Sequence, residues 1–389
     1  MFSDVLHRPF SCSRTPLSPF FKNIPAQNEI ARLDDLNAND FATTWVNKPF
    51  ILANSTNHWQ LQKTWEWKFF HERYRDVTFA AEAVNWPLDT YLDYASNNWD
   101  ESPLYLFDHS FVEKMDLKVG QRAWEGDYWI PECFGEDFFS VLGDQRPDHR
   151  WLIVGPERSG STFHKDPNAT SAWNAVIRGL KYWIMFPTAA DFPPPPGVFV
   201  SDDQSEVTSP VSLAEWLLGF HAEARSTKGC LEGLCREGEV LHVPSGWWHL
   251  VLNLEPSIAI TQNFVPRGHL ADALDFLRNK PEQVSGFGNG VLDPYRTFVS
   301  KLREAHPIIL NDAMIEMEKL QTKKRKWDDL VRNVDDGEDG NCVGSERGLG
   351  RTKKSRQVKV TTDAQKGEAE TSHFSFGFGL GESSDEEIP

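Results

Sequence analysis

The sequence predicts a mainly β protein whose centre is an antiparallel barrel or double-sheet jelly roll. Two observations carry this prediction. Short apolar or alternating runs follow one another from about residue 103 to residue 266, and turns rich in Gly, Pro and Asp separate them. Many short strands at close spacing, without helices between them, are typical of barrels and jelly rolls. The runs that we assign as strands are Leu104–Phe107, Trp151–Val154, Tyr182–Phe186, Glu239–Val243, His249–Leu254 and Ile258–Phe264.

Residues 1–100 form a flank of short helices and strands that we expect to pack on this core, which spans residues 101–266. Asn39 can cap a helix that runs through Trp45, and residues 65–74 are a second helical candidate. Between them, the apolar stretch from Pro49 to Leu52 is typical of a short buried strand.

The pattern becomes helical again over residues 267–320, and the helical runs are Leu270–Arg278, Pro294–Arg303 and Ile308–Leu320. Residues 321–389 differ in composition because they are polar and, toward the end, rich in Gly and in charges of both signs. Such a segment cannot bury enough apolar surface to order itself, so we expect a disordered tail.

Two short basic clusters lie in this predicted tail, at Lys323–Lys326 and at Arg351–Arg356. Clusters of this kind are typical of nuclear import signals and of contacts with RNA or chromatin. We therefore expect a nuclear protein, with the cytoplasm as a second compartment and RNA as a candidate partner of the tail. The simpler alternative is solvated charge in a tail of mixed sign.

Composition narrows the function further. The five cysteines are odd in number and irregularly spaced, which favours a reducing compartment. We find no apolar run of about 18 residues and no secretion signal, so we expect no membrane association. The net charge of -17 is carried mainly before residue 321. An acidic body attracts basic protein segments, although solubility explains the charge equally well.

The strongest chemical signal is His164-Lys165-Asp166, followed 83 residues after the aspartate by His249. On a strand, residues two apart point to the same face, so His164 and Asp166 can both project into a barrel. His249 begins an apolar run and can project from a facing strand. Two imidazoles and one carboxylate leave about three positions open on a metal, which is typical of Fe(II) oxygenases. Zinc remains a rival for the same ligands.

Lys181 supplies a second signal, in a stretch where two strands can join near Arg178-Gly179. A Lys that points into a narrow apolar barrel is costly unless a ligand carboxylate neutralises it. A dicarboxylate that chelates iron at one end would present its other carboxylate to such a residue. The alternative is a Lys exposed on the outside of a strand.

Several long motifs, in the correct order, resemble the JmjC-domain family. Within that family the chain is similar to the phosphatidylserine-receptor branch, of the arginine demethylase and lysyl hydroxylase type. The resemblance extends over roughly residues 1–320. The residues that carry it include Arg8-Pro9-Phe10, Ser102–Asp108, Arg158–Pro167, Thr170–Ala175, Gly179–Trp183, Gly238–His249 and Ile258–Phe264.

The resemblance implies an eight-stranded double-stranded β-helix of cupin type. It also implies that Fe(II) is bound by His164, Asp166 and His249, and that 2-oxoglutarate is the co-substrate. The residues expected around the co-substrate are Asn174 and Thr261, Lys181 at its distal carboxylate, Tyr105 in the same pocket, and Ser161 where relatives carry Thr. A Ser keeps the hydroxyl but loses a methyl group, which affects the shape of the pocket more than the iron chemistry.

The implied activity is a dioxygenase that uses O₂ and 2-oxoglutarate to hydroxylate or demethylate lysine or arginine side chains. Its expected substrates are nuclear proteins with basic segments, such as histones or splicing-factor-like proteins, which would make it a chromatin regulator. Two alternatives stay open from the residues: a JmjC hydroxylase that acts on RNA, and a cupin shell that only recruits partners. The presence of all three metal ligands and Lys181 speaks against the second.

Overall fold

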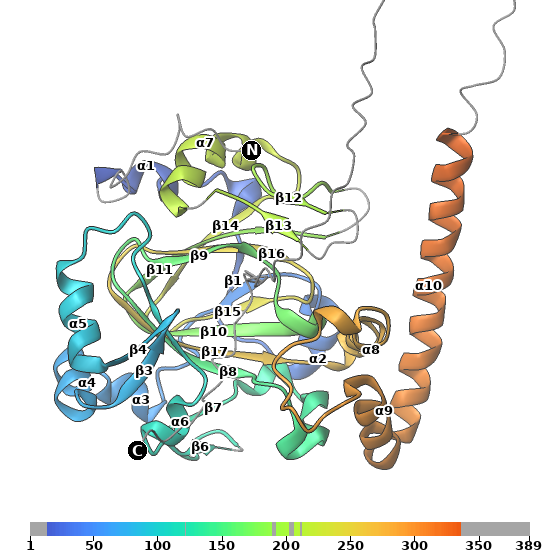
Figure 1. Ribbon diagram of the computed structural model, residues 1–389, viewed down its shortest axis with the longest axis horizontal. Coiled ribbons are helices and arrows are strands. Elements are labelled where there is room, and N and C mark those ends of the chain that lie inside the picture. The colour runs from blue at the N-terminus through green and yellow to red at the C-terminus, as the bar shows by residue number, and fades with distance from the viewer. Residues whose placement is uncertain (1–13, 121, 189–191, 202–205, 211, 336–389) are drawn as a thin grey trace, which may run out of the picture. The chain divides into compact units, whose positions relative to one another are not determined.

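The structure is a computed structural model, and Figure 1 shows its arrangement. The chain divides into two compact units, of which the first runs to Met317 and the second begins at Glu318. All the sheets and all the predicted site residues lie in the first unit. The described residues are 14–120, 122–188, 192–201, 206–210 and 212–335, of which 323–335 are described by their backbone alone.

Two β-sheets face each other at the centre of the first unit (Figure 1). The larger sheet has the order β1 (Ala31–Leu33), β2 (Phe50–Leu52), β15 (Val240–Val243), β10 (Ser171–Arg178), β17 (Ser257–Phe264), β8 (Arg150–Gly155) and β5 (Leu106–Asp108). The smaller sheet has the order β14 (Leu231–Arg236), β11 (Leu180–Phe186), β16 (Trp248–Asn253) and β9 (Gly160–His164). The eight strands of the double-stranded β-helix are divided equally between the two sheets. The larger sheet contains β8, β10, β15 and β17, and the smaller sheet contains β9, β11, β14 and β16. The predicted double-sheet, cupin-type architecture is confirmed.

Strand β10 explains how one segment serves two hydrophobic cores. All eight of its residues are buried. Side chains of a strand alternate between faces. Trp173 and Ala175 therefore pack on the N-terminal flank, in a cluster that includes Trp59. Ala172 and Asn174 point the other way and line the cavity between the two sheets.

The N-terminal flank contains short helices and a hairpin that cover the larger sheet. One detail of the sequence prediction is wrong: Asn37, and not Asn39, caps the first predicted helix, because its side chain accepts the amide N–H of Asp40 at 2.9 Å. The elements of the flank are α1 (Ser18–Phe21), α2 (Ala38–Asp40), a π-helical turn (Phe41–Trp45), α3 (Gln60–Thr64), α4 (Trp67–Tyr74), β3 (Thr78–Ala81), β4 (Val84–Pro87) and α5 (Leu88–Asn97).

The segment that we expected to be free of helices contains a helix of 14 residues, α7 (Leu213–Ser226). The signal was in the sequence, because Ser212 caps the helix by accepting the N–H of Glu215 at 3.1 Å. Trp216 and Leu217 then cover the outer face of the smaller sheet. The remaining short elements here are α6 (Phe111–Lys114), β6 (Val119–Gly120), β7 (Tyr128–Trp129), β12 (Phe199–Val200) and β13 (Val207–Thr208).

Three helices follow the sheets: α8 (Leu270–Asn279), α9 (Pro294–Ala305) and α10 (Pro307–Asp335). Helix α10 continues past residue 320, where we placed the start of the tail. The reason is compositional, since no Gly or Pro follows Pro307 within the helix and Lys, Arg and Glu are good helix formers. In the described part of the chain, no helix has the length and apolar character needed to cross a membrane.

Several predictions lie outside the described residues. They concern the disorder of residues 336–389, the basic cluster at Arg351–Arg356 and the motif Arg8-Pro9-Phe10. The side chains of the cluster at Lys323–Lys326 are likewise not described.

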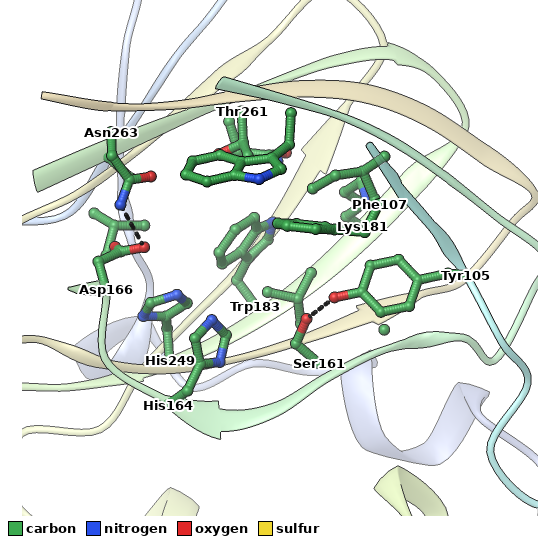
Figure 2. A pocket seen from close by; sticks show the side chains of 17 residues that line it. Tyr105, Phe107, Ser161, His164, Asp166, Lys181, Trp183, His249, Thr261 and Asn263 are labelled. Atoms are coloured by element: carbon green, nitrogen blue, oxygen red, sulfur yellow. Dashed lines mark hydrogen bonds between the residues drawn. The ribbon is translucent and has the colours of Figure 1, made fainter. Parts of the chain in front are cut away.

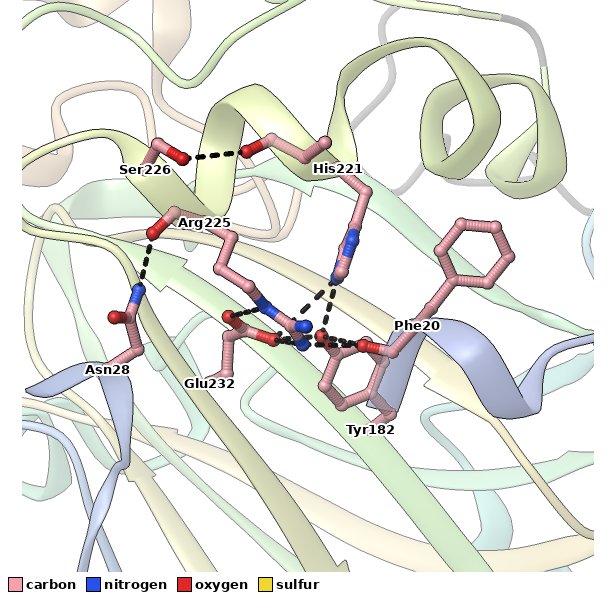
Figure 3. A network of polar contacts seen from close by, with 8 residues as sticks. Phe20, Asn28, Tyr182, His221, Arg225, Ser226 and Glu232 are labelled. Carbon is pink, nitrogen blue, oxygen red and sulfur yellow. Dashed lines mark hydrogen bonds and ion pairs between the residues drawn. The ribbon is translucent and has the colours of Figure 1, made fainter. Parts of the chain in front are cut away.

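A buried ionic network fastens α7 and α1 to the smaller sheet (Figure 3). Arg225 donates to both carboxylate oxygens of Glu232, at 2.8 and 2.6 Å, and to the carbonyl oxygen of Phe20 at 2.6 Å. The hydroxyl of Tyr182 donates to the same carboxylate and lies 2.9 Å from His221 Nε2. Burial would raise the pKa of Glu232, but the hydrogen bonds from Arg225, His221 and Tyr182 outweigh it and lower this pKa to about 2.

We expect Glu232→Gln to destabilise the protein and to weaken its dependence on pH. Because the folded pKa lies below the ordinary value of 4.5, the ionised carboxylate stabilises the fold above that pH and loses this effect as the pH falls toward 2. The difference in free energy of unfolding between wild type and variant should shrink by about 2 kcal/mol from pH 6 to pH 3. Urea unfolding of both proteins at the two pH values measures it, and a difference independent of pH would contradict the assignment.

Candidate active site

The eight predicted site residues line one cavity between the two sheets (Figure 2). They come from five strands and from the segments beside β5 and β9. The residues that the sequence analysis named are Tyr105, Ser161, His164, Asp166, Asn174, Lys181, His249 and Thr261. Aromatic walls complete the cavity, and they are Phe107, Trp151 and Trp183.

Strand register explains why residues far apart in the sequence meet here. His164 is paired with His249 across β9 and β16, and Asn174 is paired with Thr261 across β10 and β17. Residues directly opposite each other on antiparallel strands share a face of the sheet. Each pairing therefore turns two polar side chains into the same interior.

The two imidazoles are held in the form that binds metals. Nδ1 of His164 lies 2.8 Å from the carbonyl oxygen of Thr162, and Nδ1 of His249 lies 3.1 Å from that of Trp247. A carbonyl oxygen only accepts, so Nδ1 carries the hydrogen in each ring and the lone pair is on Nε2. Burial lowers the pKa of both histidines to about 4, which keeps them neutral at pH 7. The ring centroids are 4.1 Å apart.

The carboxylate of Asp166 supplies the third donor. Its Oδ1 accepts from Asn263 Nδ2 at 3.3 Å, while its Oδ2 is buried and has no hydrogen-bond partner among the described residues. Burial raises the pKa of Asp166 to about 6. A buried carboxylate oxygen without a partner is costly, and a bound cation would remove that cost.

These donors fit a divalent metal by their chemistry. Among the described residues, no three His, Cys, Asp or Glu side chains are arranged as a preformed metal site. The fit therefore rests on the available atoms, which are two Nε2 lone pairs and one unpartnered Oδ2 that border the same cavity. Two nitrogens and one carboxylate oxygen match the ligand set of Fe(II) oxygenases.

The opposite side of the cavity carries a buried cation (Figure 2). Lys181 is 2% exposed, and its Nζ donates to Asn253 Oδ1 at 2.9 Å. Among the described residues, no carboxylate forms an ion pair with it. Burial lowers the pKa of Lys181 to about 8. A buried ammonium that lacks an anion is a place for a ligand carboxylate.

The remaining predicted residues surround the space between these two charges. The hydroxyl groups of Tyr105 and Ser161 are hydrogen-bonded to each other. Burial raises the pKa of Tyr105 to about 12, so its hydroxyl stays protonated. Thr261 donates to the carbonyl oxygen of Trp173 at 3.0 Å, and the buried Oδ1 of Asn174 has no partner among the described residues.

Two asparagines that contact site residues were not predicted as functional from the sequence. Asn263 contacts Asp166, and Asn253 contacts Lys181. A signal was present, since each lies an even number of residues from a predicted site residue of the same strand, Thr261 or His249. A buried amide needs hydrogen-bond partners, and for these two asparagines the partners include residues of the site.

Comparison with known proteins finds one matching family model and several relatives. A family model described as "Cupin-like domain" matches residues 40–268. The chain is 40% identical to "Arginine-specific demethylase JMJ22" of Arabidopsis thaliana, over 79% of this chain and 59% of the relative. It is 35% identical to "Lysine-specific demethylase JMJ21" of the same plant, over 67% and 27%. It is 33% identical to "Bifunctional arginine demethylase and lysyl-hydroxylase psr-1" of Caenorhabditis elegans, over 66% of each chain. The match spans less than two thirds of the first two relatives.

Proposed function

Because the chain belongs to the cupin-like domain family, we propose that its cavity is the active site of an Fe(II)- and 2-oxoglutarate-dependent dioxygenase. The observation that carries this proposal is that one cavity holds two charged side chains without an ion-pair partner among the described residues. Asp166 lies on one side of the cavity and Lys181 on the other. A bound cation would stabilise the carboxylate of Asp166, and a bound anion would stabilise the ammonium of Lys181. A metal chelated by a dicarboxylate meets both demands.

Each residue then has a separate task. His164, Asp166 and His249 would hold the metal, and Lys181 would bind the distal carboxylate of 2-oxoglutarate. When bound, Fe(II) and its co-substrate supply the oxidation of a substrate carbon by O₂, with succinate and CO₂ as co-products. The protein binds and orients the substrate and the co-substrate, and it excludes water from the site. Asn253 fixes the ammonium of Lys181 by the hydrogen bond to its Oδ1.

We propose that the substrates are lysine or arginine side chains in basic segments of nuclear proteins, such as histones or RNA-associated proteins. The names of the relatives support this, since they include arginine demethylases and a lysyl-hydroxylase. The net negative charge of the chain favours such basic partners through long-range electrostatic attraction. A nuclear location and a role in chromatin regulation belong to the same proposal and rest on the basic clusters of the sequence.

The direct test is mass spectrometry of peptides from a nuclear extract. They are incubated with Fe(II), 2-oxoglutarate and either the wild type or His164→Ala. A gain of one oxygen atom confined to the wild type identifies hydroxylation, and a loss of one CH₂ unit identifies demethylation. RNA from the same extract is treated in parallel, and a change in RNA without any change in the peptides would contradict the protein-substrate proposal. RNA binding that weakens with salt and is lost on deleting residues 321–389 would point to RNA instead.

Replacing Asn263 with Ala should weaken metal binding. Its amide orients the carboxylate of Asp166 and also donates to Thr170 Oγ1 at 2.8 Å. Loss of such an outer partner typically costs about 10- to 100-fold in metal affinity. Anaerobic Fe(II) titration measures the loss. The matched control is Thr170→Val, which removes the second bond of the same amide, together with the bond from Thr170 Oγ1 to the carbonyl oxygen of Pro167, but leaves the bond to Asp166 and should have the smaller effect. An equal loss in both variants would contradict the assigned role.

A further inference from the structure

The turn that follows Asp166 has an unusual backbone. Asn168 and Ala169 have φ angles of 55° and 52°. Few residues other than Gly adopt this region, and Asn tolerates it better than Ala. Two consecutive residues in this conformation persist only where surrounding contacts maintain it. Asn168 is 3% exposed, so those contacts are with the protein.

The side chain of Asn168 makes two hydrogen bonds to the main chain of Ser285. Its Nδ2 donates to the carbonyl oxygen of Ser285 at 2.9 Å, and the N–H of Ser285 donates to its Oδ1 at 3.1 Å. The two residues are 117 positions apart. Ser285 belongs to the segment of residues 281–291 between α8 and α9. We call this pair of bonds the clasp.

The segment that the clasp holds is also hydrogen-bonded to the residues that lead into β8. The carbonyl oxygen of Gly286 accepts the N–H of Asp148 at 3.0 Å, two residues before β8. The carboxylate of Asp148 lies 3.4 Å from His109 Nδ1. The partner of the clasp is therefore hydrogen-bonded both to the turn and to the segment before β8, so it can support the turn.

On its other side, the same turn contacts two residues that neighbour the candidate metal ligands, Asn263 and Ser245. Thr170 Oγ1 accepts from Asn263 Nδ2, the amide that also reaches Asp166. The carbonyl oxygen of Ala169 accepts from Ser245 Oγ at 2.7 Å, four residues before His249. A displacement of this turn would therefore move the carboxylate of Asp166 and the entry to β16 together.

We propose that Asn168 is a positioning residue whose clasp on Ser285 sets the carboxylate of Asp166 for metal binding. This inference rests on the proposed role of Asp166 as a metal ligand. The clasp acts on the metal side of the cavity and makes no contact with Lys181. Its loss therefore lowers the affinity for Fe(II), while the KM for 2-oxoglutarate at saturating iron stays unchanged.

The test variant is Asn168→Gly. Gly adopts positive φ without strain, so this change removes the clasp and leaves the backbone of the turn free to keep its conformation. We expect the affinity for Fe(II), measured anaerobically in the folded full chain, to fall by about 10-fold or more. The control is Ser285→Ala, which keeps the main-chain groups of the clasp and should bind Fe(II) as the wild type does. Asn168→Ala adds strain and should bind more weakly than Asn168→Gly.

Two further measurements separate this role from a merely structural one. The thermal midpoint of each metal-free variant reports the stability of the fold, and amide hydrogen exchange at Ser285 reports the clasp. Weakened Fe(II) binding together with faster exchange at Ser285 supports the inference. A lower thermal midpoint with unchanged Fe(II) affinity overturns it and leaves the proposed function intact. If the wild type itself does not bind Fe(II), the proposed function fails and the inference falls with it.

Discussion

Asp166→Asn is expected to abolish turnover of 2-oxoglutarate, with a loss of at least ~100-fold. The change removes the negative charge among the three proposed ligands and replaces one oxygen with an amide nitrogen, which has no lone pair to offer a metal. Loss of an outer partner alone costs about 10- to 100-fold in affinity, so loss of a ligand should exceed it. Succinate formation with and without added Fe(II) measures the effect.

This variant should fold at least as well as the wild type. In the metal-free protein, Asp166 buries a carboxylate oxygen without a hydrogen-bond partner among the described residues, and a neutral amide is cheaper to bury. A thermal midpoint equal to or above that of the wild type would show that lost activity is not lost structure. The control is Asp108→Asn, since Asp108 is also an aspartate of the first unit but is more buried than Asp166 and is paired with Lys114. Retained activity in Asp166→Asn would contradict the proposed ligand set.

Lys181→Met should raise the KM for 2-oxoglutarate by roughly 30- to 5000-fold while the affinity for Fe(II) stays the same. The variant would leave the distal carboxylate of the co-substrate buried without a cation, and removing one partner of a buried charge pair costs about 2–5 kcal/mol. The measurement is a 2-oxoglutarate titration at saturating Fe(II). A rise in KM matched by lost iron affinity would mean that the site had collapsed.

The same residue predicts a dependence on pH. The free ammonium of Lys181 has a pKa that burial lowers to about 8, and only its protonated form attracts a carboxylate. Binding of 2-oxoglutarate should therefore weaken as the pH rises above 8, by about tenfold per further unit. Lys181→Arg keeps its charge at every pH in this range and serves as the control, because any affinity that it retains should not show this decline. A wild-type affinity that is flat from pH 7 to pH 9.5 would contradict the role of the ammonium.

Local sequence patterns predicted the parts of the fold that depend on near neighbours. The short apolar runs predicted strands in both sheets but missed β1 and β14. His164 and Asp166 were expected on one strand, whereas β9 ends at His164 and Asp166 lies just beyond it. Helix α7 was missed because its apolar residues lie among strands, although its Ser212 cap was visible. Helix α10 runs further than expected because its Lys, Arg and Glu residues are good helix formers.

The site could be predicted only where a residue had a recognisable task of its own. Lys181 stood out as a cation in an apolar stretch, whereas Asn263 and Asn168 act through partners 97 and 117 positions away. Such pairings follow from the strand register and the path of the segment after α8, and neither is encoded within a local window. The positive φ angles of Asn168 and Ala169 were likewise not predicted from the sequence.

The central claim is that this cavity binds Fe(II) and 2-oxoglutarate together. The most direct measurement is an anaerobic titration of the full chain with Fe(II) and 2-oxoglutarate, followed by visible absorption. Chelation of Fe(II) by the 2-oxo acid should produce a metal-to-ligand charge-transfer band that needs both components and that is absent in Asp166→Asn. A correctly folded wild type that gives no such band at saturating concentrations of both would contradict the claim.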